Sequence, residues 1–396
     1  MTESGRGASN DADDPIRLGI LGLGTAGRGA AAAAVGSSHC RVVAVCDINE
    51  NTSKEIATKF GVTHYTDARQ LCEDPEIEAV YIATPTYLHL ANALQIASAG
   101  KHLLIEKPVV KDGAEGDAIV KLAETTGVKI MAVNTRGRDA PIRAMAQVVA
   151  SGAIGRVLSL TNICYTNWVL RPRYPYELIA ALGGGVTFRQ APHQVEIART
   201  IVNSNVTAVT AVIGSTPSPV DTIGNYSALI EFENGCSATL VYNGYGYFDT
   251  AELTFGIGEN GHLTDPTASM NMRNNQSWSL DKYGDAGRAL RTQPDPTAIS
   301  KRKWGFVGLT VISGENGDLR QSREGLTLYN DLGLSEVDCS DIEGGLAVDF
   351  AEIYNAIRNG HALEHDGSWG ATTVRICEAI WKSHHEHQRV QLKTRE

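Results

Sequence analysis

The stretch that decides the fold spans residues 16 to 27 and reads Ile16-Arg17-Leu18-Gly19-Ile20-Leu21-Gly22-Leu23-Gly24-Thr25-Ala26-Gly27. An apolar run typical of a buried strand leads into a Gly-x-Gly-x-x-Gly pattern, and the alanine-rich residues 26–35 predict a helix after it. The first glycine permits a tight turn, the second lets the backbone approach a pyrophosphate, and the third lets helix and strand pack closely. We therefore predict a dinucleotide-binding loop.

An acidic residue stands where the next strand should end. Asp47 follows the apolar segment 41–46, twenty residues after Gly27. A carboxylate there accepts hydrogen bonds from the adenosine ribose hydroxyls and repels a 2′-phosphate. No arginine follows Asp47 directly, so the pattern favours NAD over NADP. The alternative is a surface turn in which Asp47 caps a helix.

Strand and helix patterns alternate through the first third of the chain, which is typical of a parallel sheet covered by helices on both faces. Further strands are expected near residues 64–65, 79–83, 101–106 and 129–133, and helices near 52–60, 89–98 and 116–125.

After Arg138 the pattern changes to a helix and then extended segments separated by turns, which predicts an antiparallel sheet. The helix is expected at 142–150, and the strands at 157–165, 206–213, 226–231, 236–242 and 252–257. Two helices, 345–359 and 370–386, end the chain.

The organisation predicted from these patterns is a two-domain α/β protein. Residues 1–14 are polar and acidic and are expected to be a disordered leader. Residues 15–137 are expected to form the dinucleotide-binding Rossmann domain, and 138–396 a substrate-binding and oligomerisation domain whose last helices pack back on the first. Residues 281–303 are polar and are expected to form a loop or lid.

Composition excludes several function classes. The 35 basic and 45 acidic residues give a net charge of −10, which disfavours a nucleic-acid partner. The longest apolar runs are too short for a membrane helix. The seven cysteines form no C-x-x-C pair, so neither a zinc site nor a disulfide framework is predicted. We expect a cytoplasmic protein with no metal.

A lysine follows one of the predicted strands. Glu106-Lys107-Pro108 ends the apolar run 102–105, and Thr84-Pro85 with His89 follows the preceding strand. The carboxyl ends of parallel strands meet at one edge of the sheet, so both segments should line the crevice where a nicotinamide ring would lie. A lysine there is a candidate base for hydride chemistry. Alone, the tripeptide would favour a solvated charge pair at a strand end, with the proline ending the sheet.

Together these motifs resemble those of the Gfo/Idh/MocA oxidoreductases. The resemblance continues through Gly183-Gly184-Gly185 to His193 and through Asp349-Phe350 in the predicted helix 345–359. It implies a Rossmann domain followed by an α/β domain with an open, mostly antiparallel sheet that often supports dimers or tetramers. It also implies that Lys107 and His193 are catalytic. The cofactor-binding residues expected on these grounds are Gly22, Gly24, Thr25, Ala26, Gly27, Asp47, Thr84, Pro85, His89, Glu106, Lys107 and Asn134.

One position departs from the family pattern. Arg189 stands four residues before His193, where the family carries an aspartate that contacts the reacting polyol. Arginine accepts no hydrogen bonds and is permanently cationic, whereas it binds carboxylates through two parallel hydrogen bonds. Arg171 and Arg173 lie nearby in the sequence. We expect these arginines to bind an anionic substrate; the alternative for Arg171 and Arg173 is pairing with acids such as Glu177.

A closer resemblance fits this substrate class. Segments such as Trp168-x-x-Arg171-Pro172-Arg173 and Gly317-Asp318-Leu319-Arg320 are similar to a subgroup described as phthalate 4,5-cis-dihydrodiol dehydrogenases. This resemblance implies NAD-dependent oxidation of a cis-dihydrodiol dicarboxylate. Two alternatives stay open: a sugar, polyol or glycoside dehydrogenase in which Arg189 is structural, and a non-catalytic NAD-binding regulator.

Overall fold

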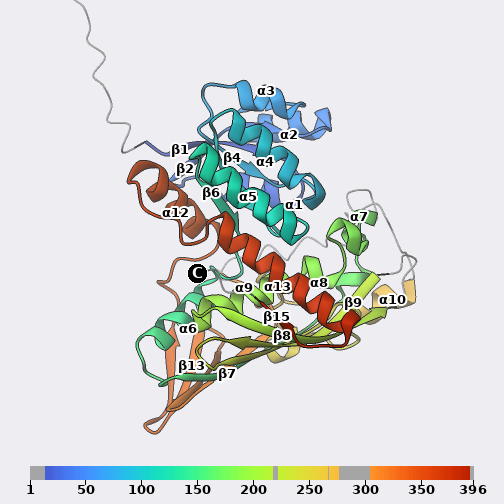
Figure 1. The fold of residues 1–396 in the computed structure, drawn as a ribbon, viewed down its shortest axis with the longest axis vertical. Helices are drawn as coiled ribbons and strands as arrows, with labels where there is room; N and C mark the ends of the chain where they lie inside the picture. Colours follow the sequence, from blue (N-terminus) through green and yellow to red (C-terminus); the bar gives the residue numbers. More distant parts are fainter. Residues whose placement is uncertain (1–13, 217–221, 266, 276–303, 393–396) are drawn as a thin grey trace, which may run out of the picture.

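The computed structural model describes residues 14–216, 222–265, 267–275 and 304–392, which are organised around two β-sheets (Figure 1). The expected leader, except its last residue, and the expected loop at 281–303 lie outside these ranges. No helix among the described residues is long and apolar enough to cross a membrane.

The first sheet is parallel and has the strand order β3-β2-β1-β4-β5-β6. The order reverses between β1 and β4, and sheets of this kind bind dinucleotides in the crevice at the carboxyl ends of those strands. The strands are β1 (Ile16–Leu21), β2 (Cys40–Cys46), β3 (Thr63–Tyr65), β4 (Ala79–Ile82), β5 (His102–Glu106) and β6 (Ile130–Val133). The helices between them are α1 (Thr25–Ala33), α2 (Glu50–Phe60), α3 (Ala68–Glu73), α4 (His89–Ser98) and α5 (Gly113–Thr126).

The second sheet has nine strands in the order β14-β13-β12-β11-β7-β10-β9-β8-β15. Only β7 and β10 pair in parallel; the other neighbours are antiparallel. This confirms the expected α/β fold with a Rossmann sheet and a mostly antiparallel second sheet. The strands are β7 (Val157–Tyr165), β8 (Val206–Thr216), β9 (Thr222–Phe232), β10 (Ser237–Asn243), β11 (Leu309–Gly314), β12 (Gly317–Gln321), β13 (Gly325–Asn330), β14 (Gly333–Asp338) and β15 (Val390–Gln391).

One predicted strand, at residues 252–257, is wrong. The Asp249 side chain accepts a hydrogen bond from the N–H of Ala251 at 2.8 Å and so begins a 3-10 helix, Thr250–Leu253, in place of the strand. Conversely, strands β11 to β14 were not predicted, because their segments are short and lack a long alternating apolar pattern.

Helices cover one face of the second sheet, and the last two helices return to the first sheet (Figure 1). Phe350 and Ile353 of α12 are fully buried in the core around β1. A Cβ added to Gly370 of α13 would lie 2.6 Å from Cβ of Ala132 in β6, so α13 packs tightly against the first sheet. The helices are α6 (Ala140–Ala150), α7 (Pro175–Leu178), α8 (Val186–Arg189), α9 (Ala191–Val202), α10 (Ala268–Asn275), α12 (Leu346–Arg358) and α13 (Gly367–Glu386).

Candidate active site

The glycine loop after β1 forms a cradle without room for side chains. Gly22 has φ +92°, and a Cβ on Gly27 would lie 1.9 Å from the carbonyl oxygen of Gly22. Gly24 is the N-cap of α1 and supplies no capping side chain, and Thr25 and Ala26 lie in the first turn of this helix. The backbone N–H groups at a helix start are the donors that bind an anion. These features fit the pyrophosphate of a dinucleotide.

Asp47 lies at the end of β2 and is joined to this loop. Its Oδ2 accepts a hydrogen bond from the N–H of Leu23 at 2.8 Å, and its Oδ1 accepts one from the N–H of Asn49 at 2.9 Å. Each oxygen keeps a free lone pair. The carboxylate is therefore oriented beside the loop and fits a ribose hydroxyl pair.

The second wall of the crevice is the segment after β4, which contains Thr84 and Pro85. His89 is buried and faces backbone carbonyls with both ring nitrogens: Nε2 lies 2.8 Å from the oxygen of Thr84, and Nδ1 lies 3.0 Å from that of Pro108. Burial lowers the pKa of His89 to about 4. The ring thus joins the loops after β4 and β5 and would shape a cofactor site through their position.

Lys107 follows β5 directly. Its Nζ donates a hydrogen bond to the backbone oxygen of Arg189 at 3.2 Å. Burial first, and then the neighbouring Arg189 guanidinium, lowers the pKa of Lys107 to about 7. The preceding residue, Glu106, is held by the Tyr81 hydroxyl at 2.5 Å. A lysine with this pKa is substantially neutral near pH 7 and can accept a proton.

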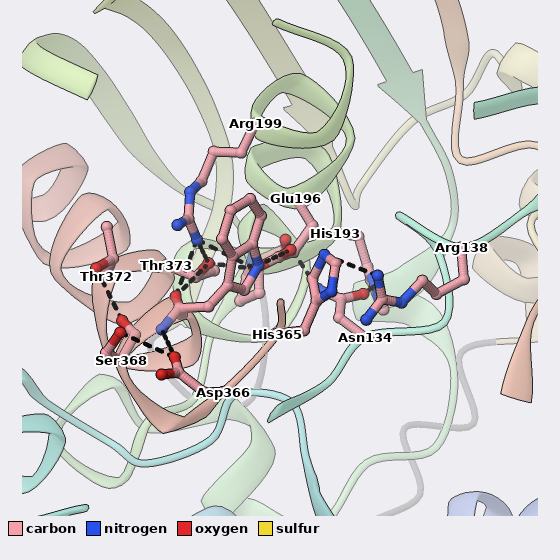
Figure 2. A network of polar contacts seen from close by, with 12 residues as sticks. Asn134, Arg138, His193, Glu196, Arg199, His365, Asp366, Ser368, Thr372 and Thr373 are labelled. Atoms are coloured by element: carbon pink, nitrogen blue, oxygen red, sulfur yellow. Dashed lines mark hydrogen bonds and ion pairs between the residues drawn. The ribbon is translucent and has the colours of Figure 1, made fainter. Parts of the chain in front are cut away.

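His193 lies in the first turn of α9 and contacts Asn134, which follows β6 (Figure 2). Nδ1 of His193 is 3.2 Å from Oδ1 of Asn134, while Nδ2 of Asn134 donates to the backbone oxygen of Pro192 at 3.2 Å. Because this places the amide oxygen toward the ring, Nδ1 carries the proton and Nε2 is the acceptor. Burial and the cations Lys107, Arg136 and Arg189 hold the pKa of His193 well below its usual value.

Further along α9, a polar cluster fixes the helix that carries His193 (Figure 2). Glu196 accepts a hydrogen bond from Nε1 of Trp369 at 2.6 Å and pairs with Arg199 at 3.5 Å. The Arg199 guanidinium lies 3.6 Å from the Trp369 ring centroid and donates to the Trp369 backbone oxygen at 2.9 Å. The three α9 side chains 193, 196 and 199 share one face of the helix, so contacts with α13 hold the turn that carries His193 in place.

Two of the predicted substrate-binding arginines share one buried carboxylate. Oε1 of Glu177, which is 1% exposed, lies 3.5 Å from Nη1 of Arg173 and 3.6 Å from Nη2 of Arg189. Nη1 of Arg189 also donates to the Thr86 hydroxyl at 2.9 Å, and Arg173 stacks on the Trp168 ring at 4.1 Å. The alternative of pairing with Glu177 therefore holds for Arg173, and Arg189 shares this partner.

Arg171 and a fourth arginine, Arg136, contact consecutive residues of one turn. Nη1 of Arg171 lies 3.9 Å from Oε2 of Glu259, and Nη2 of Arg136 donates to Oδ1 of Asn260 at 3.1 Å. Arg136 was missed in the sequence analysis. The signal was present, since Arg136 comes two residues after Asn134 at the edge of the sheet that carries Lys107.

Among the described residues, no group of three or more His, Cys, Asp or Glu side chains could hold a metal ion. All seven cysteines are buried and unpaired. The candidate site consists instead of a lysine, a histidine and arginines at the crevice of a dinucleotide-binding sheet.

Comparisons with known proteins agree with this geometry. The Gfo/Idh/MocA model described as "Oxidoreductase family, NAD-binding Rossmann fold" matches residues 16–134. A second model, "GFO/IDH/MocA C-terminal domain", matches residues 142–264.

Individual relatives cover nearly the whole chain. The 1-carboxy-3-chloro-3,4-dihydroxycyclohexa-1,5-diene dehydrogenase of Comamonas testosteroni is 28% identical over 380 residues, which are 92% of this chain and 94% of that protein. A crystal structure from Bordetella bronchiseptica RB50 is 31% identical with a TM-score of 0.85, covering 96% of this chain and 100% of that one. Levoglucosan dehydrogenase, solved with NADH and levoglucosan, shares the fold at 20% identity with a TM-score of 0.72, over 96% of this chain and 100% of that one.

Proposed function

The chain belongs to the Gfo/Idh/MocA family of oxidoreductases, and we propose that it oxidises a carboxylated cis-dihydrodiol, such as phthalate 4,5-cis-dihydrodiol. It is an NAD-dependent dehydrogenase. The observation that carries the choice of substrate is the group of arginines at the candidate site, of which Arg136 and Arg189 act on Lys107, because guanidinium groups bind carboxylates strongly. The name of the Comamonas relative supports it, since that name describes a carboxylated dihydroxycyclohexadiene.

The residues at the carboxyl ends of the first sheet's strands fit NAD. The backbone between Gly22 and Gly27 would hold the pyrophosphate, and the Asp47 carboxylate would accept hydrogen bonds from the adenosine ribose. Thr84, Pro85 and Glu106 border the nicotinamide end of the crevice. When bound, NAD supplies the ring that accepts a hydride from the substrate carbon.

In the reaction that we propose, Lys107 accepts the proton of the substrate hydroxyl as the hydride leaves the carbon that bears it. Neutral Lys107 keeps an N–H for the oxygen of Arg189 and offers its lone pair to the hydroxyl. His193, neutral and protonated on Nδ1, accepts a hydrogen bond through Nε2 and so orients the diol. The resulting hydroxyketone then tautomerises: the carbon that bears the second hydroxyl loses its C–H proton to a base, and the ketone oxygen takes up a proton. The product is a dihydroxybenzene, so aromaticity favours it.

A substrate panel tests this proposal. Purified protein with NAD is mixed with a carboxylated cis-dihydrodiol, the same diol without its carboxylate, levoglucosan and myo-inositol, and NADH absorbance is followed. We expect kcat/KM to be highest for the carboxylated diol by at least about tenfold, as one charge-assisted hydrogen bond predicts. Preference for levoglucosan or inositol would replace this function with the polyol alternative, and no turnover of any alcohol would favour a regulator.

We also infer that the protein forms a homodimer or homotetramer through the second sheet. Helices cover one face of this sheet, whereas Val212 and Leu229 on the opposite face are 66% and 41% exposed. The two side chains lie at diagonal positions of neighbouring strands, since Val212 pairs with Ser227 and Leu229 pairs with Thr210. Exposed apolar side chains close together on one sheet face are typical of an interface between subunits. The unpaired cysteines support a reducing compartment such as the cytoplasm.

A further inference from the structure

The ion pairs and hydrogen bonds that the arginines of the candidate site already make differ in strength. These arginines are Arg136, Arg171, Arg173 and Arg189. Arg173 and Arg189 are the counter-ions of Glu177, a carboxylate at 1% exposure. Removing either would leave a buried negative charge with less compensation, which is energetically costly. These two arginines are therefore committed to the structure of the loop before α9.

Arg171 and Arg136 are held more loosely. Nε of Arg171 donates to the neutral amide of Asn167 at 2.7 Å, and its ion pair with Glu259 is long, at 3.9 Å. Its side chain is 35% exposed, the most of the four. Arg136 donates to the neutral amide of Asn260 at 3.1 Å and lies 3.4 Å from Asp139. Charged N–H groups of both arginines therefore keep capacity for another acceptor.

The turn at Glu259 and Asn260 contacts both arginines, which follow strands of different sheets. Arg171 precedes the glycine triplet of the second domain, whereas Arg136 follows β6 of the first sheet. Arg136 is also two residues from Asn134, the partner of His193, and its charge lowers the pKa values of both Lys107 and His193. The Arg136 guanidinium thus borders the reacting centre, and Arg171 contacts the residue next to its partner Asn260.

We infer that Arg136 and Arg171 form the carboxylate-binding subsite of this enzyme, with one substrate carboxylate accepting hydrogen bonds from both. The inference rests on the proposed carboxylated substrate and narrows the arginine cluster to two residues, one of them outside the sequence-based prediction. Arg173 and Arg189 then hold the loop and set the charge around Lys107. Because the subsite draws one arginine from each side of the crevice, a carboxylate would also link the two sides when it binds.

The test compares Arg136→Gln, Arg171→Gln, the double variant and Arg136→Lys with the wild type. Each is assayed with a carboxylated cis-dihydrodiol and with the same diol lacking the carboxylate. Calorimetry on the enzyme–NADH complex measures binding of 3,4-dihydroxybenzoate and of catechol. Arg156→Gln, on the exposed surface with Glu315 as its partner, is the matched control.

We expect each glutamine variant to lose about 10- to 100-fold in affinity for 3,4-dihydroxybenzoate, with changes under about threefold for catechol. Because Arg136 also lowers the pKa of Lys107, turnover is compared as the ratio of kcat/KM for the carboxylated diol to kcat/KM for the uncarboxylated diol, and this ratio should fall by a similar factor. Arg136→Lys should lose less, because it keeps the charge but not the paired donors. The double variant should lose less than the product of the single losses, because both arginines bind the same carboxylate.

Equal losses for carboxylated and uncarboxylated ligands, or no loss, would overturn the subsite. The calorimetry separates this outcome from failure of the proposed function. If the wild type turns over no dihydrodiol but still binds 3,4-dihydroxybenzoate through Arg136 and Arg171, the proposed function fails and the subsite stands. If the wild type binds 3,4-dihydroxybenzoate no better than catechol, the subsite itself is wrong.

Discussion

Nδ1 of His193 lies 3.2 Å from Oδ1 of Asn134, so a residue that follows the first sheet sets the protonation of a histidine in the second domain. The amide nitrogen of Asn134 donates a hydrogen bond to the backbone oxygen of Pro192 at 3.2 Å, which prevents the amide group from flipping. His193 thus keeps Nε2 as its hydrogen-bond acceptor.

We predict that Asn134→Asp will introduce an acidic limb in the pH profile of kcat. A carboxylate beside Nδ1 favours the protonated ring, so the depressed pKa of His193 rises toward neutrality and the enzyme loses its Nε2 acceptor as pH falls. Asn134→Leu should instead lower kcat about tenfold or more without a new limb. Superimposable profiles for Asn134→Asp and wild type would contradict this role; Asn359→Asp, at the exposed end of α12, serves as the control.

The charge of Arg189 should control the pH at which Lys107 becomes active. Because the pKa of Lys107 is lowered to about 7, the neutral form is present above that pH, and kcat/KM should rise with pH and level off above about 7. Arg189→Met removes a cation and should move this limb to higher pH, whereas Arg189→Lys should move it little.

Lys107→Ala should lower kcat about 10²- to 10⁴-fold at every pH while NADH fluorescence still reports binding.

Two glycines in α1 should respond oppositely to alanine. Gly27→Ala places a Cβ 1.9 Å from the oxygen of Gly22, so the loop must move, and we expect a loss of more than about 2 kcal/mol in unfolding free energy together with weak NADH binding. Gly29 has nothing within 4 Å of an added Cβ, and Gly29→Ala should be neutral or stabilise the helix by up to about 1 kcal/mol. Thermal melts and NADH titration measure both effects. Normal NADH binding by Gly27→Ala would show that the close packing of Gly27 against the oxygen of Gly22 is not needed for the cofactor site.

Asp47 should determine the choice of cofactor. Asp47→Ser removes the ribose acceptor and the charge that repels a 2′-phosphate, so the KM for NAD should rise about 10- to 100-fold while NADP becomes a better substrate. Adding Ile48→Arg, at a side chain that is 95% exposed, should improve NADP further. Glu315→Gln removes an exposed carboxylate after β11 of the second sheet, where its partner is Arg156, and should change neither value. An unchanged ratio of NAD to NADP in the Asp47 variants would place the adenosine elsewhere.

The face of the second sheet that carries Val212 and Leu229, opposite the helices, should determine the oligomeric state. Val212→Glu and Leu229→Glu place charges on that face, and light scattering should show a shift toward monomer. Leu332→Glu, in the turn after β13 and 96% exposed, is the control for added charge. An unchanged mass for the variants at Val212 and Leu229 would place the interface on another surface.

Local patterns predict most of the first sheet because its strands, apart from the short β3, are mainly apolar runs that alternate with helical patterns. Side-chain partnerships across long separations were less predictable. Nothing near Glu177 in the sequence shows that it would be buried between Arg173 and Arg189, and the link between Arg136 and Asn260 spans 124 residues. The position of Lys107 after a predicted strand and the family resemblance at His193 therefore identified these two residues as candidates, whereas the assignment of individual arginines required the three-dimensional arrangement.

The return of α12 and α13 to the first sheet has a consequence for how the polypeptide matures during synthesis. Phe350 and Ile353 complete the core around β1, and Val374 joins the core around β4. The segment before residue 138 therefore leaves the ribosome with apolar surfaces that only the last part of the chain can cover. We expect the nucleotide-binding part to stay incompletely folded during synthesis until α12 and α13 have been made and can pack against it. NAD should therefore bind only after these two helices are in place.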